Sequence, residues 1–317
     1  MTGGVTDMSR KTMKYVNCPW GRLIVSVLLL LASSTLCAQD LEPRRWSHMP
    51  TGLNVLGIGT SYVEGDIYFD PVLQLEDVEF EMAAVGLVYL RTFDFLGKSA
   101  RADFLVPYAN GNWHGLQAGE PAKTRRSGFR DPRVRLSVLL YGGPAQTPQE
   151  FFKSPKSNTV VGAALSVKIP WGEYYPEKLI NLGSNRWVFR PQLGVTHTRN
   201  KWTYELTGSL FWYDDNDDFF GETQLENEVL YTLQGHLIYT FKPGLWVSFS
   251  MAYGDGADAF IDDVDKDLRV DNWLTALSLG VPISRQQGLK LSWLRARTQN
   301  DKGADLDSIN VGWTLVF

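Results

Sequence analysis

The sequence predicts an all-β protein, a transmembrane antiparallel up-and-down β-barrel of twelve strands preceded by a cleaved signal peptide. Three observations predict this class. The N-terminus has the charge and hydropathy order of a secretory signal. Long segments in which apolar and polar side chains alternate then follow one another. The chain ends on alternating apolar residues, and its last residue is Phe317. A mean hydropathy of only −0.18 fits a barrel in which the outer face alone is apolar.

Composition excludes several other classes. The chain has 317 residues, and a helical transporter of that length would need several apolar runs of about 20 residues, which are missing. An aromatic content of 13% and a formal net charge of −4 argue against a disordered chain. There is no basic excess, so no nucleic-acid partner is expected. No G-x-S-x-G and no Walker loop occur, and we expect neither an enzyme nor a cofactor.

Residues 1–38 have the features of a signal peptide. Four basic residues precede an apolar run at 23–31, and small residues lead to a cleavage site after Ala38. The run is too short to span a bilayer as a helix. Cleavage removes both cysteines, Cys18 and Cys37, and leaves a net charge near −7. The predicted organisation is a signal peptide at 1–38, a short N-terminal periplasmic segment at 39–52 and an outer-membrane β-barrel at 53–317.

Twelve segments carry the strand pattern. In residues 133–138, for example, Val134, Leu136 and Val138 alternate with polar side chains. Most of the segments exceed the usual soluble strand of roughly 5–6 residues and reach the about 9–11 residues that a tilted transmembrane strand needs. They lie near 53–63, 78–92, 100–113, 129–141, 159–171, 186–197, 201–213, 228–241, 244–254, 270–283, 288–298 and 306–317.

The connections between these segments alternate in length. Those after even-numbered segments are mostly short, whereas those after odd-numbered segments are long, at 114–128, 172–185, 214–227 and 255–269. This is the pattern of outer-membrane barrels, which have short periplasmic turns and longer external loops. The connection at 142–158 is long where a short turn is expected, and residues 148–152 within it can form a short helix.

Aromatic residues gather near the ends of the predicted strands, where interfacial girdles form. The set comprises Trp171, Trp187, Trp202, Trp212, Trp273, Trp313, Tyr108, Tyr213, Tyr239 and Tyr253. In the last segment Trp313, Leu315 and Phe317 alternate with smaller residues, a chain end common in outer-membrane barrels and recognised by their assembly machinery. Expected partners are therefore outer-membrane lipid, lipopolysaccharide, this assembly machinery and a small-molecule solute.

If the apolar side chains of each predicted strand face lipid, the polar side chains that alternate with them face the lumen. The lumen-lining candidates are Glu79, Glu81, Arg101, Asp103, Arg133, Arg135, Lys168, Arg186, Arg190, Gln192, Glu205, Gln234, His236 and Lys290. Such charges can select solutes, or they can only cross-link the strands. A barrel of twelve strands is intermediate in width between packed eight-stranded barrels and open porins of 16–18 strands. The strand number therefore predicts a narrow path through the lumen.

The predicted external loops are acidic. Asp214, Asp215, Asp217 and Asp218 are weak surface candidates for Ca²⁺, because carboxylates suit hard cations. Their spacing does not match an EF-hand, so no firm metal site is predicted. A solvated run of charge and a bridge to lipopolysaccharide through divalent ions are the other two interpretations.

The stretch at 126–136, which contains Gly128 and Asp131-Pro132, resembles a motif of the outer-membrane family named for the MetA pathway of phenol degradation. Residues 181–187, 215–221 and 231–239 resemble the same family, and the similarity extends from about 53 to 317. The resemblance implies an outer-membrane transporter linked by name to aromatic degradation, with no catalytic or binding residues to transfer.

Within this motif Pro132 fixes an extended start of a strand, and Gly128 permits a tight backbone. Arg130, Arg133 and Arg135 then face one region of the lumen. They can meet Glu79, Glu81 or Asp103 on neighbouring strands, or they can attract anionic aromatic acids.

Two functions follow from these patterns. The first is a channel or transporter in the outer membrane for small solutes, aromatic or hydrophobic, that pass through a charged lumen. The alternative is a structural or interaction barrel with a closed lumen and functional acidic surface loops. An enzyme is disfavoured because the only histidines are His48, His114, His197 and His236, and none has a companion at metal-ligand spacing.

Overall fold

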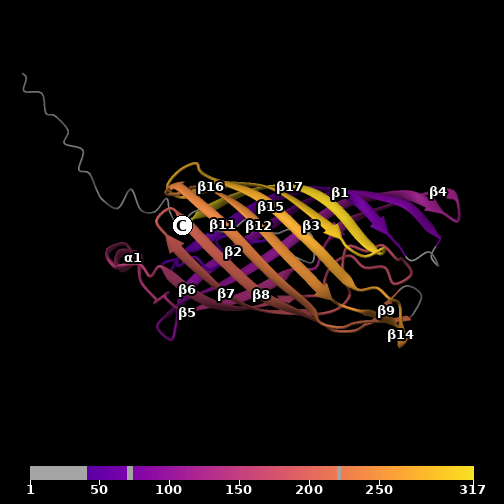
Figure 1. The fold of residues 1–317 in the computed structure, drawn as a ribbon, viewed down its shortest axis with the longest axis horizontal. Helices are drawn as coiled ribbons and strands as arrows, with labels where there is room; N and C mark the ends of the chain where they lie inside the picture. Colours follow the sequence, from indigo (N-terminus) through magenta and orange to yellow (C-terminus); the bar gives the residue numbers. More distant parts are fainter. Residues whose placement is uncertain (1–40, 70–73, 220–222) are drawn as a thin grey trace, which may run out of the picture.

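The computed structural model describes residues 41–69, 74–219 and 223–317 (Figure 1). The signal peptide expected at 1–38 and residues 39 and 40 lie outside the described residues. No helix in the described ranges is long and apolar enough to cross a membrane.

One large sheet closes on itself to form the barrel. Its strand order is β2-β1-β17-β16-β15-β12-β11-β8-β7-β6-β5-β3-β4, and β2 also pairs with β3. Successive strands β4 and β5 both pair with β3, so they act as two parts of one wall strand and the wall has the twelve antiparallel strands that the sequence predicts. The wall strands are β1 (Asn54–Tyr68), β2 (Leu75–Phe95), β3 (Lys98–Gln117), β4 (Glu120–Phe129), β5 (Arg133–Tyr141), β6 (Thr159–Lys168), β7 (Val188–Arg199), β8 (Trp202–Tyr213), β11 (Leu230–Lys242), β12 (Leu245–Gly256), β15 (Val270–Pro282), β16 (Gln287–Thr298) and β17 (Gly303–Val316).

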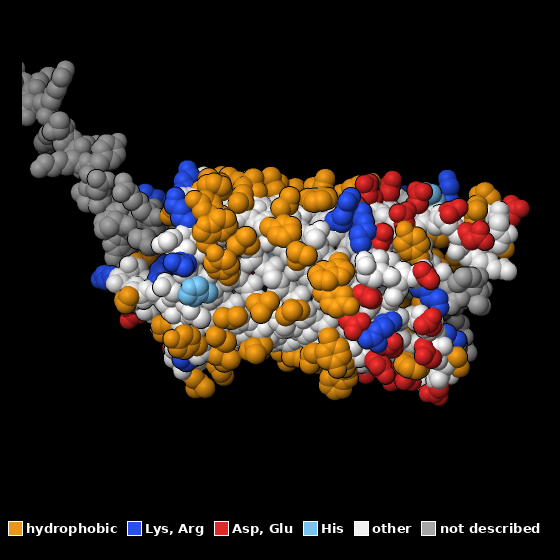
Figure 2. Space-filling view, viewed as in Figure 1, with side chains coloured by type: hydrophobic (Ala, Val, Ile, Leu, Met, Phe, Trp, Pro, Cys, Tyr) orange, Lys and Arg blue, Asp and Glu red, His pale blue; other side chains and the backbone are white. Residues whose placement is uncertain are grey.

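The strands form because their side chains alternate between two different environments. In β8, Leu206 and Leu210 are exposed on the outer face, whereas the alternating residues Glu205, Thr207 and Ser209 are buried on the inner face. Outward apolar side chains are exposed along the wall strands, and on the face seen in Figure 2 they form a belt across the barrel. A closed sheet pairs its backbone groups without water, which is what a bilayer core requires.

The two ends of the barrel differ. Short turns, the C-terminus and helix α1 (Pro148–Lys153) lie at one end, the turn side, and β4 and the small sheet described below lie at the other, the loop side (Figure 1). Helix α1 fulfils the expectation of a helix in the 142–158 connection. It starts with a capping box, in which the backbone N–H and the hydroxyl of Thr147 bond to Glu150 and lower the pKa of that carboxyl. Phe151 buries the helix against the barrel end.

Three of the predicted long loops contain ordered strands. The 114–128 region is a continuation of the β3–β4 hairpin, with a tight turn at Ala118 and Gly119, which have positive φ angles of 50° and 79°. Loops 214–227 and 255–269 instead contribute a four-stranded sheet at the loop side. Its strands are β9 (Asn216–Phe219), β10 (Thr223–Asn227), β13 (Ala259–Ile261) and β14 (Val264–Asp265).

Residues 41–53, here called the N-terminal segment, lie inside the barrel. The sequence predicted a short periplasmic segment at 39–52, but the described part contacts inward side chains of the wall. Trp46, for example, is 0% exposed and bonds to Thr207 of β8. The segment leaves the lumen at the turn side, where β1 begins. The hydrophobic pattern of residues 41–53 did not reveal this position.

Candidate functional site: the barrel lumen

A cluster of buried charges lies in the lumen around Arg135. Asp103 of β3 and Arg135 of β5 are opposite each other in the sheet, and Arg135 Nη2 lies 3.0 Å from Asp103 Oδ1. Arg135 Nη1 also donates to Glu42 of the N-terminal segment at 2.7 Å. Arg45 of the same segment lies 3.7 Å from Asp103. The wall and the segment therefore share one network of alternating charges.

Further contacts hold the segment in place. The backbone N–H of Arg45 donates to Glu205 Oε1 at 2.9 Å, and the guanidinium of Arg101 donates to the backbone carbonyl of Arg45. Arg133 lies 3.6 Å from Glu42. The sequence suggested Glu79, Glu81 and Asp103 as acidic partners for the arginines of the 126–136 motif. Of these three, only Asp103 contacts Arg135. The sequence interpretation missed Glu42 because that residue was assigned to a periplasmic segment.

The remaining inward candidates line the wall around and beyond this cluster: Lys168 is opposite Arg133 and His236 is opposite Glu205 in the sheet. His236 Nδ1 and Ser250 Oγ form a hydrogen bond of 2.8 Å between β11 and β12. Arg190 stacks over Phe211 and Arg186 stacks over Tyr213, at 4.5 and 4.7 Å from the ring centroids. The other predicted lumen residues on the inward parity are Lys168, Gln192, Gln234 and Lys290. Tyr213 faces inward with Phe211, so it does not belong to the outer girdle.

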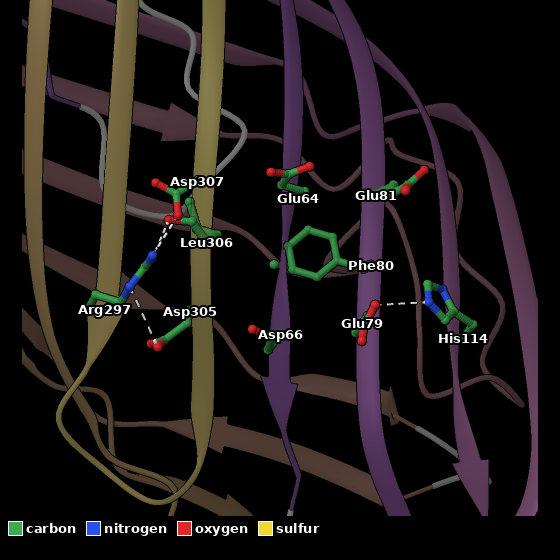
Figure 3. Close-up of a pocket in the computed structure, with 11 residues that line it drawn as sticks. Glu64, Asp66, Glu79, Phe80, Glu81, His114, Arg297, Asp305, Leu306 and Asp307 are labelled. Atoms are coloured by element: carbon green, nitrogen blue, oxygen red, sulfur yellow. Dashed lines mark hydrogen bonds and ion pairs between the residues drawn. The ribbon is translucent and has the colours of Figure 1, made fainter.

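Glu79 and Glu81 do not face the lumen. They project outward from β2. Glu79 is 62% exposed and lies 3.1 Å from His114 of β3 (Figure 3). Across β17, β1 and β2 the outward carboxylates are opposite one another in two rows: Asp307, Glu64 and Glu81, then Asp305, Asp66 and Glu79. The rows border a surface hollow of about 300 Å³. The polar face of β2 is outward here because this part of the strand lies beyond the belt.

Like charges opposite each other destabilise a sheet, and basic side chains at the edge of the rows reduce that cost. Arg295 and Arg297 of β16 lie 3.0 and 2.6 Å from the carboxylate of Asp307. Arg297 is also 3.8 Å from Asp305 (Figure 3). These outward charges belong to the surface of the loop side and not to the lumen.

On one side of the lumen, in its loop half, the wall is apolar. Inward side chains from seven neighbouring strands form one buried cluster, here called the apolar zone: Val63, Val78, Phe80, Ala109, Trp113, Ala252, Leu274, Ala276, Leu294, Ala296 and Leu306. Leu41 and Leu182 pack against it from inside the barrel. The sequence interpretation missed this zone because it assigned the apolar side chains of every strand to the lipid-facing side. The signal was present in β15, where Trp273, Leu274, Ala276 and Leu277 make both faces apolar.

A cavity of about 410 Å³ opens next to the apolar zone at the loop side. Leu75, Val78 and Trp113 line it from the wall, and Leu179 and Ile180 line it from the connection between β6 and β7. Charged side chains, among them Lys123 and Arg126, stand at its margin. The cavity therefore combines an apolar floor with a charged rim.

Residues 169–187, here called the inner loop, place Leu182 against the apolar zone. Asp131, between β4 and β5, accepts hydrogen bonds from the Gly172 N–H and from the N–H and hydroxyl of Ser184, at 2.9, 2.8 and 2.6 Å. Tyr174 donates to the Asp218 carbonyl and accepts from Asn216. Burial raises the pKa of the Tyr174 hydroxyl, which keeps it protonated and able to donate.

The weak metal candidates Asp214, Asp215, Asp217 and Asp218 do not form a metal-binding group. Asp217 Oδ1 accepts a hydrogen bond from Gln224 of β10 at 3.0 Å, and Asp214, Asp215 and Asp218 are exposed. Within residues 41–69, 74–219 and 223–317, no three His, Cys, Asp or Glu side chains converge to hold a metal ion.

The histidines lie apart from one another. His114 is on the outer face of β3 with Glu79, His236 is in the lumen, His197 bonds to Thr159, and His48 bonds to the Pro144 carbonyl.

A closed antiparallel barrel with an apolar outer belt and a polar inner face is the architecture of outer-membrane proteins, and this chain is of that class. The family model described as "Putative MetA-pathway of phenol degradation" matches residues 68–302, so the chain belongs to that family. The similarity that the sequence motifs suggested is thus confirmed.

Solved structures share this fold. An outer membrane channel from Pseudomonas putida F1 superposes with a TM-score of 0.72 at 21% identity, over 87% of this chain and 100% of that chain. The β domain of the Bordetella autotransporter BrkA superposes with a TM-score of 0.50 at 10% identity, over 83% of this chain and 99% of that chain. A search of curated protein sequences finds no significant match.

Proposed function

We propose that this protein is an outer-membrane channel for small aromatic or hydrophobic solutes, which pass passively through the lumen. The observation that carries the proposal is the apolar zone, joined to the 410 Å³ cavity at the loop side. An apolar lining inside the barrel serves no contact with lipid. It lowers the free energy of an apolar solute that leaves water, by about 25 cal/mol for each Å² buried.

The cavity is large enough for the expected solutes. An apolar cavity of roughly 150 Å³ already binds benzene, whereas the cavity here measures about 410 Å³. If the loop side faces the exterior, as the lengths of the connections suggest, a solute meets this cavity first and the apolar zone next. The description of the family, which names phenol degradation, supports an aromatic solute.

The cluster of buried charges around Arg135 holds the N-terminal segment and does not contact the solute in this proposal. The N-terminal segment lies across the lumen between the apolar zone and the turn side, so passage requires it to move. Glu42 and Arg45 hold it through Arg135, Asp103 and Glu205. The lumen-lining charges thus hold the segment inside the lumen, and the solute passes through the lumen once the segment has moved.

A structural or interaction barrel is the second candidate, and the same segment favours it. Several charge-assisted contacts fix residues 42–46 inside the lumen, and the four-stranded sheet presents acidic side chains at the loop side. A barrel that stays closed would work through that surface. The two candidates differ in whether anything crosses the lumen.

The deciding experiment is single-channel conductance of the refolded protein in planar bilayers, with Arg135→Glu as the test variant. The substitution places a carboxylate beside Glu42 and Asp103, so we expect the segment to leave the lumen more often and the open probability to rise severalfold. Arg285→Glu, at an exposed turn, makes the same charge change and is expected to behave like the parent.

Flux of toluene into vesicles that contain each protein completes the experiment. Faster toluene entry through Arg135→Glu than through the Arg285→Glu control would support the channel. A folded Arg135→Glu barrel that neither conducts ions nor admits toluene would contradict the channel function and favour a structural barrel with a closed lumen.

Partners follow from the same surfaces. We propose that the apolar belt contacts outer-membrane lipid, that the loop side meets lipopolysaccharide, and that Trp313, Leu315 and Phe317 are read by the barrel-assembly machinery. Trp313 and Leu315 point outward on β17 and Phe317 directly follows the strand and is exposed, so another protein can reach all three during assembly.

A further inference from the structure

The inner wall contains a slot that is four strands wide. Leu139 of β5, Gly162 of β6, Gly194 of β7 and Thr207 of β8 are consecutive partners in the sheet, and all four face inward. The row therefore begins with an apolar side chain, continues with two positions that have no Cβ, and ends with a hydroxyl. Its shape is a shallow, flat-floored slot with one polar end.

The indole ring of Trp46 occupies this slot. Its Nε1 donates to Thr207 Oγ1 at 2.7 Å, and the ring packs with Leu139, Val160 and Ala164. A Cβ at either Gly162 or Gly194 would overlap the ring. The guanidinium of Arg45 covers the ring, with Cζ 5.4 Å from its centroid. The slot is thus complementary to one planar aromatic ring that carries a single donor.

The occupant belongs to the N-terminal segment, not to the wall. If the segment leaves the lumen, the slot becomes accessible to a solute in the lumen. Its apolar floor and the Thr207 hydroxyl belong to the wall and stay in place. A ring of the same kind as the Trp46 side chain can then fill it with the same contacts. Water would be a poor substitute, because it offers no apolar contact with Leu139 and the glycine floor.

We propose that this slot is a binding site for small planar aromatic molecules with one N–H or O–H donor, such as indoles and phenols, and that Trp46 is its internal ligand. Solute and Trp46 exclude each other from the slot. A ligand that binds only one of two conformations shifts the population toward that conformation, so such solutes favour the state in which the segment is out. The consequence for opening rests on the proposed channel function, whereas the slot itself does not.

The test uses Trp46→Gly, which empties the slot without altering the wall. The probe is 5-fluoroindole, followed by ¹⁹F NMR in detergent micelles. The matched control is Trp46→Gly with Gly194→Val, because the valine side chain fills the space that the ring has left. Folding of each variant is checked by the change in gel mobility on heating.

We expect saturable binding of 5-fluoroindole to Trp46→Gly, and at least tenfold weaker binding both to the parent, whose slot is occupied, and to the Gly194→Val control. Adding Thr207→Val to Trp46→Gly removes the acceptor for the donor group. That change should weaken 5-fluoroindole binding roughly fivefold, the effect of one net hydrogen bond of about 1 kcal/mol. Binding of fluorobenzene, which has no donor, should be unchanged.

Equal binding to Trp46→Gly and to its Gly194→Val control would overturn the proposal, since the signal would then come from micelles or another surface. The outcome is separable from that of the channel experiment. Slot binding together with a non-conducting Arg135→Glu barrel would keep the site and remove the channel. Conductance without slot binding would keep the channel and remove the site.

Discussion

At the scale of single residues, Asp131 explains why the D-P pair stands at the junction of β4 and β5. Its carboxylate accepts three hydrogen bonds from the inner loop, two of them from backbone N–H groups. The sequence interpretation credited the motif with an extended start of a strand through Pro132. The structure adds a second reason, which is that Asp131 ties residues 169–187 to the wall beside the apolar zone.

Asp131→Ala should loosen the inner loop. Hydrogen bonds to a charged group are worth about 1.5–3 kcal/mol each, so a net loss of about 2–3 kcal/mol is a modest expectation. Local opening would then rise roughly 30- to 160-fold. Limited trypsin digestion with mass spectrometry measures this as faster cleavage after Lys178, which is exposed within the loop. Asp301→Ala, at an exposed turn, is the control, and equal cleavage rates in the two variants would contradict the role of Asp131.

At the scale of elements, the pairing of β6 with β7 decides where the N-terminal segment rests. Gly162 and Gly194 are opposite each other and together leave the space for Trp46. Either glycine alone would leave room for only part of the ring. The position of a segment that has no regular secondary structure is therefore set by two wall strands that are more than 100 residues away from it along the chain.

Gly194→Val in the otherwise unchanged protein should expel Trp46 and expose the segment. The expected result is at least a tenfold faster reaction of maleimide with a cysteine placed at position 49, because Met49 is buried in the parent. Gly208→Val is the matched control: that glycine faces outward on β8 with nothing within 4 Å of the added Cβ. If cysteine reactivity at position 49 is the same in both variants, the glycine floor does not hold the segment.

At the scale of the whole molecule, closure depends on the pairing of the first and last strands. β1 and β17 are in register from Val55 with Val316 to Tyr68 with Gly303. The backbone groups of Asn54 and Phe317 exchange two hydrogen bonds at the turn side. The side chain of Phe317 is nevertheless 60% exposed, so it contributes little to the packing of the finished barrel.

Phe317→Ala should therefore lower assembly in cells more than it lowers stability. We expect a severalfold drop in folded barrel in the outer membrane, measured as the heat-modifiable fraction on gels, with the unfolding midpoint of refolded protein nearly unchanged. Ile309→Ala removes an equally exposed outward side chain of β17 and serves as the control. A parallel fall in assembly for both variants would show that the terminal residue has no special part.

Much of this architecture was predictable because period-two alternation is a local property. A strand between lipid and a polar interior must alternate, so the wall strands and the inward position of Arg101, Asp103, Arg135, Arg190 and Glu205 follow from the sequence. The short helix at 148–153 follows from its capping residues. The same rule fails for Glu79 and Glu81, because a strand that extends beyond the bilayer no longer needs an apolar outer face.

The sequence by itself determined that the chain is a twelve-stranded outer-membrane barrel with a charged inner face. Only the tertiary structure decided what those charges hold. Glu42 meets Arg135 across 93 residues and Arg45 meets Glu205 across 160, and Trp46 enters a slot built by four strands. Alternation reports which face a residue lies on, but it carries no information about which distant residues share the lumen, because that depends on how the sheet closes.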